Sequence, residues 1–107
     1  MTAPGREPTL LERRTVSRKT PRDGRLEITP ESAERLAALG DDFALASGGT
    51  AGRARLHTMP CGCAKGASSG HVHHFVESPL LMALVPETSV LIELEEATET
   101  VRVERAG

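Results

Sequence analysis

Residues 90–104 read Val-Leu-Ile-Glu-Leu-Glu-Glu-Ala-Thr-Glu-Thr-Val-Arg-Val-Glu, and they carry the clearest structural pattern in the chain. Over 90–95 every second residue is apolar and Glu occupies two of the positions between, which indicates a strand with one face toward a core. The alternation returns over 101–104, where Val alternates with Arg and Glu. Residues 96–99 suit a short connection, so the stretch predicts an antiparallel hairpin.

Shorter patterns on the N-terminal side of this hairpin extend the sheet. Alternating apolar residues predict strands over 25–28, 43–46, 53–59 and 71–77. Ser-Gly-Gly-Thr over 47–50 is typical of a turn between two of them. The sequence therefore predicts five or six short strands.

One helix and one further helical segment interrupt the strands. Thr29 can cap a helix, Pro30 suits its first position, and Gly40 suits its end. A second cap and proline open residues 78–85, whose apolar side chains predict a short buried helix or turn. The expected class is small α+β: a mainly antiparallel β sheet or partial barrel with one or two short helices.

The composition predicts a thin core. The chain has 107 residues, which suits one domain, but it contains no Trp or Tyr and only two Phe. Leu, Val, Ile, Ala and Met must then supply most of the buried surface. Domains of this size often gain stability from a metal, a disulfide or a partner.

Charge divides the chain into two parts. Residues 1–25 hold seven basic and three acidic side chains, a net charge of +4, whereas the remainder has a net charge of −6. We expect 1–23 to be a flexible basic arm and 24–107 to be a zinc-stabilised α+β domain. The arm is either a solubilising tail or a contact for a protein or nucleic acid. It contains no aromatic residue on which bases could stack.

Nothing in the sequence indicates a membrane segment. No stretch approaches the roughly 18 apolar residues of a spanning helix, and the first residues lack the apolar run of a signal peptide. We therefore expect a cytoplasmic protein with no membrane partner. In a reducing compartment two cysteines favour metal binding over a disulfide.

The residues that could bind a metal are concentrated in one short stretch. The five candidate ligands are Cys61, Cys63, His71, His73 and His74. Thiolate and imidazole are the ligands that zinc prefers, and four of them form a closed structural site. Side chains two apart on a strand point the same way, so His71 and His73 can converge on one ion with the two cysteines. A regular strand would turn His74 away, whereas an irregular one would let it replace either histidine.

Two other questions about the site stay open. His57 lies on the predicted facing strand, but a register slip of one residue would move it to the other face. Zinc is the first choice of metal, with copper(I) favoured only if Met59 joins the cysteines, and iron less favoured. A disulfide between Cys61 and Cys63 is disfavoured because residues two apart rarely reach unstrained geometry.

A catalytic alternative begins from Glu77. The pattern His71-x-His73-x-x-x-Glu77 resembles part of the metal motif of cupins, which implies a β-barrel and a metal held by two histidines and a glutamate. The resemblance covers seven residues. The glycine expected further on is replaced by Leu84, and no histidine follows His74 to supply the second motif. Glu77 could otherwise accept a hydrogen bond from a ligand histidine without binding the metal itself, or it could be a solvated carboxylate.

The leading functional prediction is a small zinc-binding module with a structural site. It would present a pinned loop and a basic arm to a protein or nucleic-acid partner. The alternatives are a metal-dependent enzyme with an open His/Glu/Cys site, or a metal sensor or carrier. Four or five donors favour a closed site, so we lean away from an enzyme. The sequence names neither the partner nor the oligomeric state.

Overall fold

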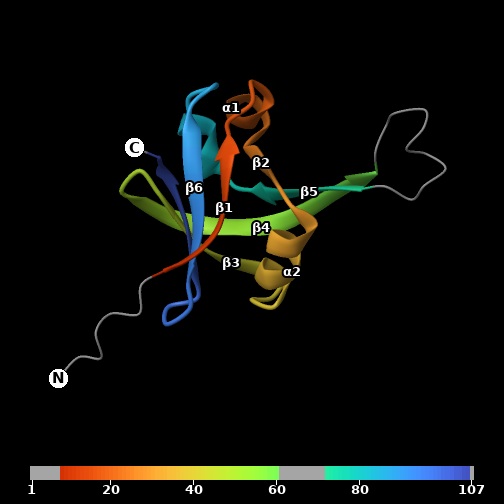
Figure 1. The fold of residues 1–107 in the computed structure, drawn as a ribbon, viewed down its shortest axis with the longest axis vertical. Coiled ribbons are helices and arrows are strands. Elements are labelled where there is room, and N and C mark those ends of the chain that lie inside the picture. Colours follow the sequence, from red (N-terminus) through yellow and green to blue (C-terminus); the bar gives the residue numbers. More distant parts are fainter. Residues whose placement is uncertain (1–7, 61–71, 107) are drawn as a thin grey trace.

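The computed structural model describes residues 8–60 and 72–106. Its strands are β1 (Thr9–Thr15), β2 (Arg25–Ile28), β3 (Asp42–Ser47), β4 (Thr50–Pro60), β5 (Val72–Glu77), β6 (Ser89–Glu95) and β7 (Thr100–Arg105). Its helices are α1 (Lys19–Asp23), α2 (Pro30–Ala37) and the 3-10 helix η2 (Pro79–Ala83). The fold is small α+β and dominated by its sheet, as predicted (Figure 1).

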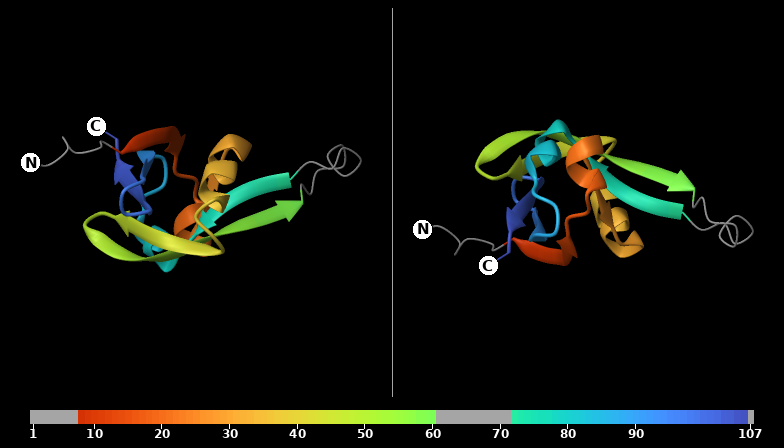
Figure 2. Two further views of the ribbon diagram at one scale, coloured as in Figure 1. Left: turned by 90° about the horizontal axis from the view of Figure 1, so that it is seen from below. Right: turned by 90° about the horizontal axis from the view of Figure 1, so that it is seen from above.

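The strands form one mixed sheet in the order β1-β6-β7-β3-β4-β5-β2. Neighbouring strands are antiparallel except β3 and β7, which run parallel. The two ends of the order approach each other, because Glu12 on β1 accepts a 2.8 Å hydrogen bond from the backbone N–H of Thr29, directly after β2. The sheet is therefore a nearly closed barrel, as expected for the predicted class (Figure 2).

The hairpin that the sequence predicted most clearly is β6–β7. Ile92 pairs with Val103, and Leu94 pairs with Val101. All four side chains are almost fully buried, so the alternating residues do form the inner face. The hairpin does not lie at an edge of the sheet, because β1 flanks β6 and β3 flanks β7.

Helix α2 begins as its sequence predicts. The Thr29 hydroxyl accepts a hydrogen bond from the Ser32 backbone N–H, and Pro30 occupies the first turn. Such a cap contributes on the order of 1 kcal/mol. The helix buries Ala33 and Leu36 against the sheet.

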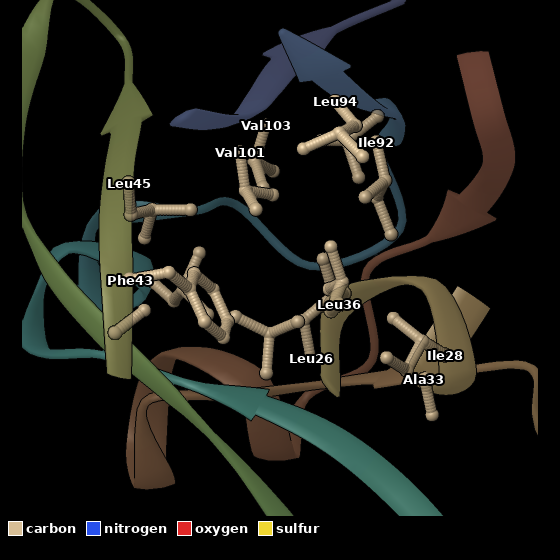
Figure 3. Packing of buried hydrophobic residues seen from close by; sticks show 14 of the residues in the cluster. Leu26, Ile28, Ala33, Leu36, Phe43, Leu45, Ile92, Leu94, Val101 and Val103 are labelled. Atoms are coloured by element: carbon tan, nitrogen blue, oxygen red, sulfur yellow. The ribbon is translucent and has the colours of Figure 1, made fainter. Parts of the chain in front are cut away.

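The core lies inside the barrel and under α2 (Figure 3). Its members are mostly Leu, Val and Ile, with Phe43 as the one aromatic residue among the buried hydrophobics that the structure describes. Methionine contributes less than expected, because Met59 and Met82 are 40 % and 53 % exposed. Each fully buried Leu, Val, Ile or Phe side chain stabilises the fold by about 1.5–3 kcal/mol. A core of this composition therefore gives modest stability.

The flexible arm predicted for 1–23 is wrong over residues 8–23. Residues 9–15 form β1, which pairs antiparallel with β6, and residues 19–23 form α1. Val16 and Thr20 are each 1 % exposed and anchor the segment. The charged composition reflects an edge strand, where charged side chains are tolerated because one side of the strand faces solvent. Residues 1–7 lie outside the described part of the chain.

The segment after β5 is less buried than predicted. Ser78 caps η2 by accepting a hydrogen bond from the Leu80 N–H, and Leu81 is fully buried. Met82 and Val85 are more than half exposed, so this short helix covers the sheet with one side only. Within the ranges described here, no helix has the length and apolar character needed to cross a membrane.

Candidate metal centre

Strands β4 and β5 form a two-stranded ribbon that extends beyond the barrel (Figures 1 and 2). Pro60 pairs with Val72 at its outer end, and Met59 pairs with His73 one step inward. The chain between these ends contains three candidate ligands, Cys61, Cys63 and His71, which lie outside the described residues. The ribbon therefore carries the described candidates, His73 and His74, directly beside that segment.

The register separates His73 from His74. His73 lies opposite Met59, whereas His74 lies opposite Thr58 on one side and Ile28 on the other. Ile28 is 3 % exposed and belongs to the core, so His74 is on the inner face of the ribbon and His73 on the outer face. A single ion on the outer face is accessible to His73 and not to its neighbour.

A carboxylate orients the His73 ring. Nδ1 of His73 lies 2.8 Å from Oε2 of Glu27 on the neighbouring strand β2. Arg14 on β1 lies 4.0 Å from the other oxygen of Glu27 and helps to hold it. When Nδ1 carries the proton that this contact requires, Nε2 carries the lone pair. Histidines that bind metals commonly have such a carboxylate partner, which fixes the tautomer and the ring orientation.

The register also places His57 on the outer face. His57 pairs with Phe75, and the centroid of its ring lies 6.3 Å from that of Phe75. The centroid of the His73 ring lies 6.4 Å from that of Phe75. His57 and His73 thus share one face of the ribbon, and each lies near Phe75. The register therefore fixes the face of His57, which the sequence had left open.

Glu77 is engaged by two arginines. One carboxylate oxygen accepts a 2.7 Å hydrogen bond from Arg25, and the other accepts a 2.8 Å bond from Arg55. The Arg25 and Arg55 guanidinium groups hold the pKa of Glu77 below its ordinary value. A metal bound through Glu77 would compete with these ion pairs, which argues against the cupin-like set.

The described residues do not by themselves complete a metal site. Within 8–60 and 72–106, no three His, Cys, Asp or Glu side chains come together as potential ligands. Any ion bound through His73 would need donors from the segment between β4 and β5.

Glu27 is the site residue that sequence reasoning missed. The alternation of Glu27 with Leu26 and Ile28 predicts that it lies on the solvent side of a strand. Its proximity to His73 depends on β2 pairing with β5, a contact between segments 46 residues apart.

Comparison with known proteins gives no family: the sequence matches no protein-family model, and no curated protein matches it either.

Proposed function

We propose that this protein is a small zinc-binding module whose structural site forms at the outer end of the β4–β5 ribbon. The proposed ligands are Cys61, Cys63, His71 and His73, and His57 is the reserve ligand. His74 is the least favoured of the candidate histidines, since it lies on the inner face. Two thiolates and two imidazoles suit zinc better than copper or iron.

The observation that carries the proposal is the contact between His73 and Glu27. His73 lies near the outer end of β5, opposite Met59 and close in sequence to Cys61 and Cys63. Its ring is oriented by a carboxylate, as is common for histidines that bind zinc.

The ion would stabilise the part of the fold with the least core. The outer ribbon has exposed Met59 and Val72 side chains and lies beyond the packed barrel. Structural zinc contributes on the order of 10 kcal/mol in isolated zinc-finger peptides. The site would therefore hold the outer strands together and fix the loop that joins them.

The fixed loop is the proposed contact for a partner protein or nucleic acid. The basic residues of 8–25 would contribute from the folded surface, because this segment forms β1 and α1 instead of an arm. We place the module in the cytoplasm, where the cysteines stay reduced and available to zinc.

Metal analysis of the purified protein tests this function, combined with circular dichroism before and after chelation. One zinc per chain and a loss of β-sheet signal on chelation are expected. Cys61→Ser and Cys63→Ser should each abolish stoichiometric zinc, and a protein without bound metal would show the proposal to be wrong. A metal whose removal leaves the fold intact would indicate a sensor or carrier instead.

The enzyme alternative makes a different prediction at the metal. An open catalytic site keeps a water or exchangeable ligand in its coordination sphere. Cobalt(II) substitution distinguishes the two, because a closed Cys₂His₂ site gives a tetrahedral spectrum that does not change when small anions are added. A spectrum that shifts with added anion would favour an enzyme.

A further inference from the structure

A cavity of about 360 Å³ lies between α1 and the outer face of the β4–β5 ribbon. Its charged lining consists of Lys19, Arg22, Asp23 and Arg25, and the imidazole of His73 lines it as well. Its apolar lining includes the Phe75 ring and the Met59 thioether. The volume is in the range of small-molecule sites, which combine an apolar floor with a few convergent polar groups.

Cationic side chains outnumber acidic ones in the lining of this cavity. Of its three cations, Arg22 pairs with Asp23 at 3.1 Å, and Arg25 pairs at 2.7 Å with Glu77, which lies outside the lining. No ion pair to Lys19 is found among the residues that the structure describes. Lys19 is therefore the charge that an anionic ligand would neutralise, and Arg22 and Arg25 have further N–H groups to donate to it.

Arg25 is held in place for such a role. Its Nε donates to Glu77 at 2.7 Å, and its Nη1 lies 3.7 Å from the Met59 sulfur. A guanidinium has five N–H donors, so the bond to Glu77 leaves other donors for a ligand. Because the Arg25 side chain is already fixed, it loses less conformational entropy when a ligand binds.

We infer that this cavity binds a small organic anion that carries a planar ring, with Lys19, Arg22 and Arg25 on the anionic group and Phe75 against the ring. Phosphate and sulfonate esters of aromatic groups have this chemistry. The inference stands on the described residues, and it shares His73 with the proposed zinc site, because that side chain lines the same cavity.

A second cavity, of about 410 Å³, is lined by Glu77 and does not have this property. Its arginines are matched by acids that line the same cavity, because Arg53 pairs with Asp42 and Arg55 pairs with Glu77. It lacks an aromatic ring, and its two arginines face three acids, Asp23, Asp42 and Glu77. The smaller cavity is therefore the better candidate.

Titration of the full-length protein with phenyl phosphate, followed by amide chemical shifts in NMR, tests the inference. Inorganic phosphate and benzyl alcohol serve as the two half-ligands, one with the charge and one with the ring. Phenyl phosphate is expected to bind about five-fold more tightly than either, since ring contacts and charge contacts add. The shifts should centre on α1 and on Phe75.

Two variants and one matched control make the result specific. Lys19→Gln should weaken phenyl phosphate binding about three-fold. Arg18→Gln removes the same charge one residue away, from a side chain that is 87 % exposed and outside the cavity lining, and should leave binding unchanged. Phe75→Leu should remove most of the preference for phenyl phosphate over inorganic phosphate.

Three outcomes would overturn the inference. They are shifts centred elsewhere on the fold, phenyl phosphate binding no more tightly than inorganic phosphate, and equal effects of Lys19→Gln and Arg18→Gln. The last would mean that only the overall charge attracts the anion. Lys19 is exposed, so its variant remains a valid test even if Phe75→Leu does not fold.

Discussion

Glu12 on β1 holds Thr29, the N-cap of α2, through two hydrogen bonds to one carboxylate oxygen. The backbone N–H of Thr29 donates at 2.8 Å and its hydroxyl at 3.3 Å. β1 and β2 are the two ends of the sheet order, so this contact joins the ends through a side chain where no strand ladder does so. The Glu12 side chain is only 10 % exposed, so water replaces it poorly.

Glu12→Ala should therefore destabilise the protein by about 1–3 kcal/mol, because the Thr29 N–H would lose its acceptor in a partly buried place. Urea denaturation measures the change. Glu34→Ala, at an exposed position of α2, is the matched control and should stay within about 0.5 kcal/mol of the wild type. Equal stability of the Glu12→Ala and Glu34→Ala proteins would show that the contact does not close the barrel.

Gly24 and Gly48 have similar backbone conformations but different surroundings, so alanine substitutions at the two positions can be compared. Both have positive φ, +70° and +58°, but a Cβ at Gly24 would lie 2.9 Å from the Ser78 carbonyl oxygen, whereas a Cβ at Gly48 meets nothing within 4 Å. Gly48→Ala should cost about 1 kcal/mol, from the left-handed conformation alone. Gly24→Ala should cost clearly more, and thermal unfolding of the two variants gives the comparison. A Gly24→Ala protein as stable as the Gly48→Ala protein would contradict the close approach of the backbone.

Glu77 predicts a pH dependence of stability. Its pKa is depressed in the folded state, so its stabilisation is full above the ordinary value of 4.5 and is lost as the pH falls through the folded pKa. Glu77→Gln should lower the free energy of unfolding by about 1 kcal/mol at neutral pH, since Arg55 is largely exposed and screened. The difference from wild type should shrink below pH 4.5.

Denaturation of both proteins across this pH range measures the effect. Glu104→Gln is the control, at a position of β7 that alternates with buried Val103. A difference between wild type and Glu77→Gln that does not change with pH would mean that the charge of Glu77 is not the cause.

The two adjacent histidines give the sharpest test of the zinc site. His73→Ala should remove stoichiometric zinc, whereas His74→Ala should retain it, because the two side chains lie on opposite faces of β5. Glu27→Gln should lower zinc affinity about 10–100-fold while leaving the ligands in place. Competition with a chromogenic chelator measures all three affinities. Loss of zinc in His74→Ala and not in His73→Ala would place the site on the inner face.

The sequence predicted most of the fold because the strong patterns were local. The alternation over 90–104 and the Thr29-Pro30 start of α2 needed no distant information, and both were confirmed. β1 was missed because its Thr-Leu-Leu-Glu-Arg-Arg-Thr sequence does not alternate and is strongly charged. Such an edge strand is defined by its pairing with β6 near the other end of the chain, which no local pattern reports.

The candidate site shows the same limit. The sequence identified the cluster of Cys and His residues, and it left open whether His74 faces away from His73. It could not identify Glu27 as the partner of His73 or fix the face of His57, because both depend on strand register. The ion pairs of Glu77 with Arg25 and Arg55 could not be predicted either, because they depend on the pairing of β2 and β4 with β5.

The position of β6 and β7 has a consequence for how the chain folds during synthesis. They are the last strands along the sequence, yet in the sheet they lie between β1 and β3. While the ribosome is still adding residues beyond β5, β1 has no ladder partner and β3 has only β4. Barrel closure must therefore follow the arrival of this hairpin, and contacts of such long sequence separation form slowly. Until then Leu45 and the rest of the inner face remain exposed to the binding sites of chaperones.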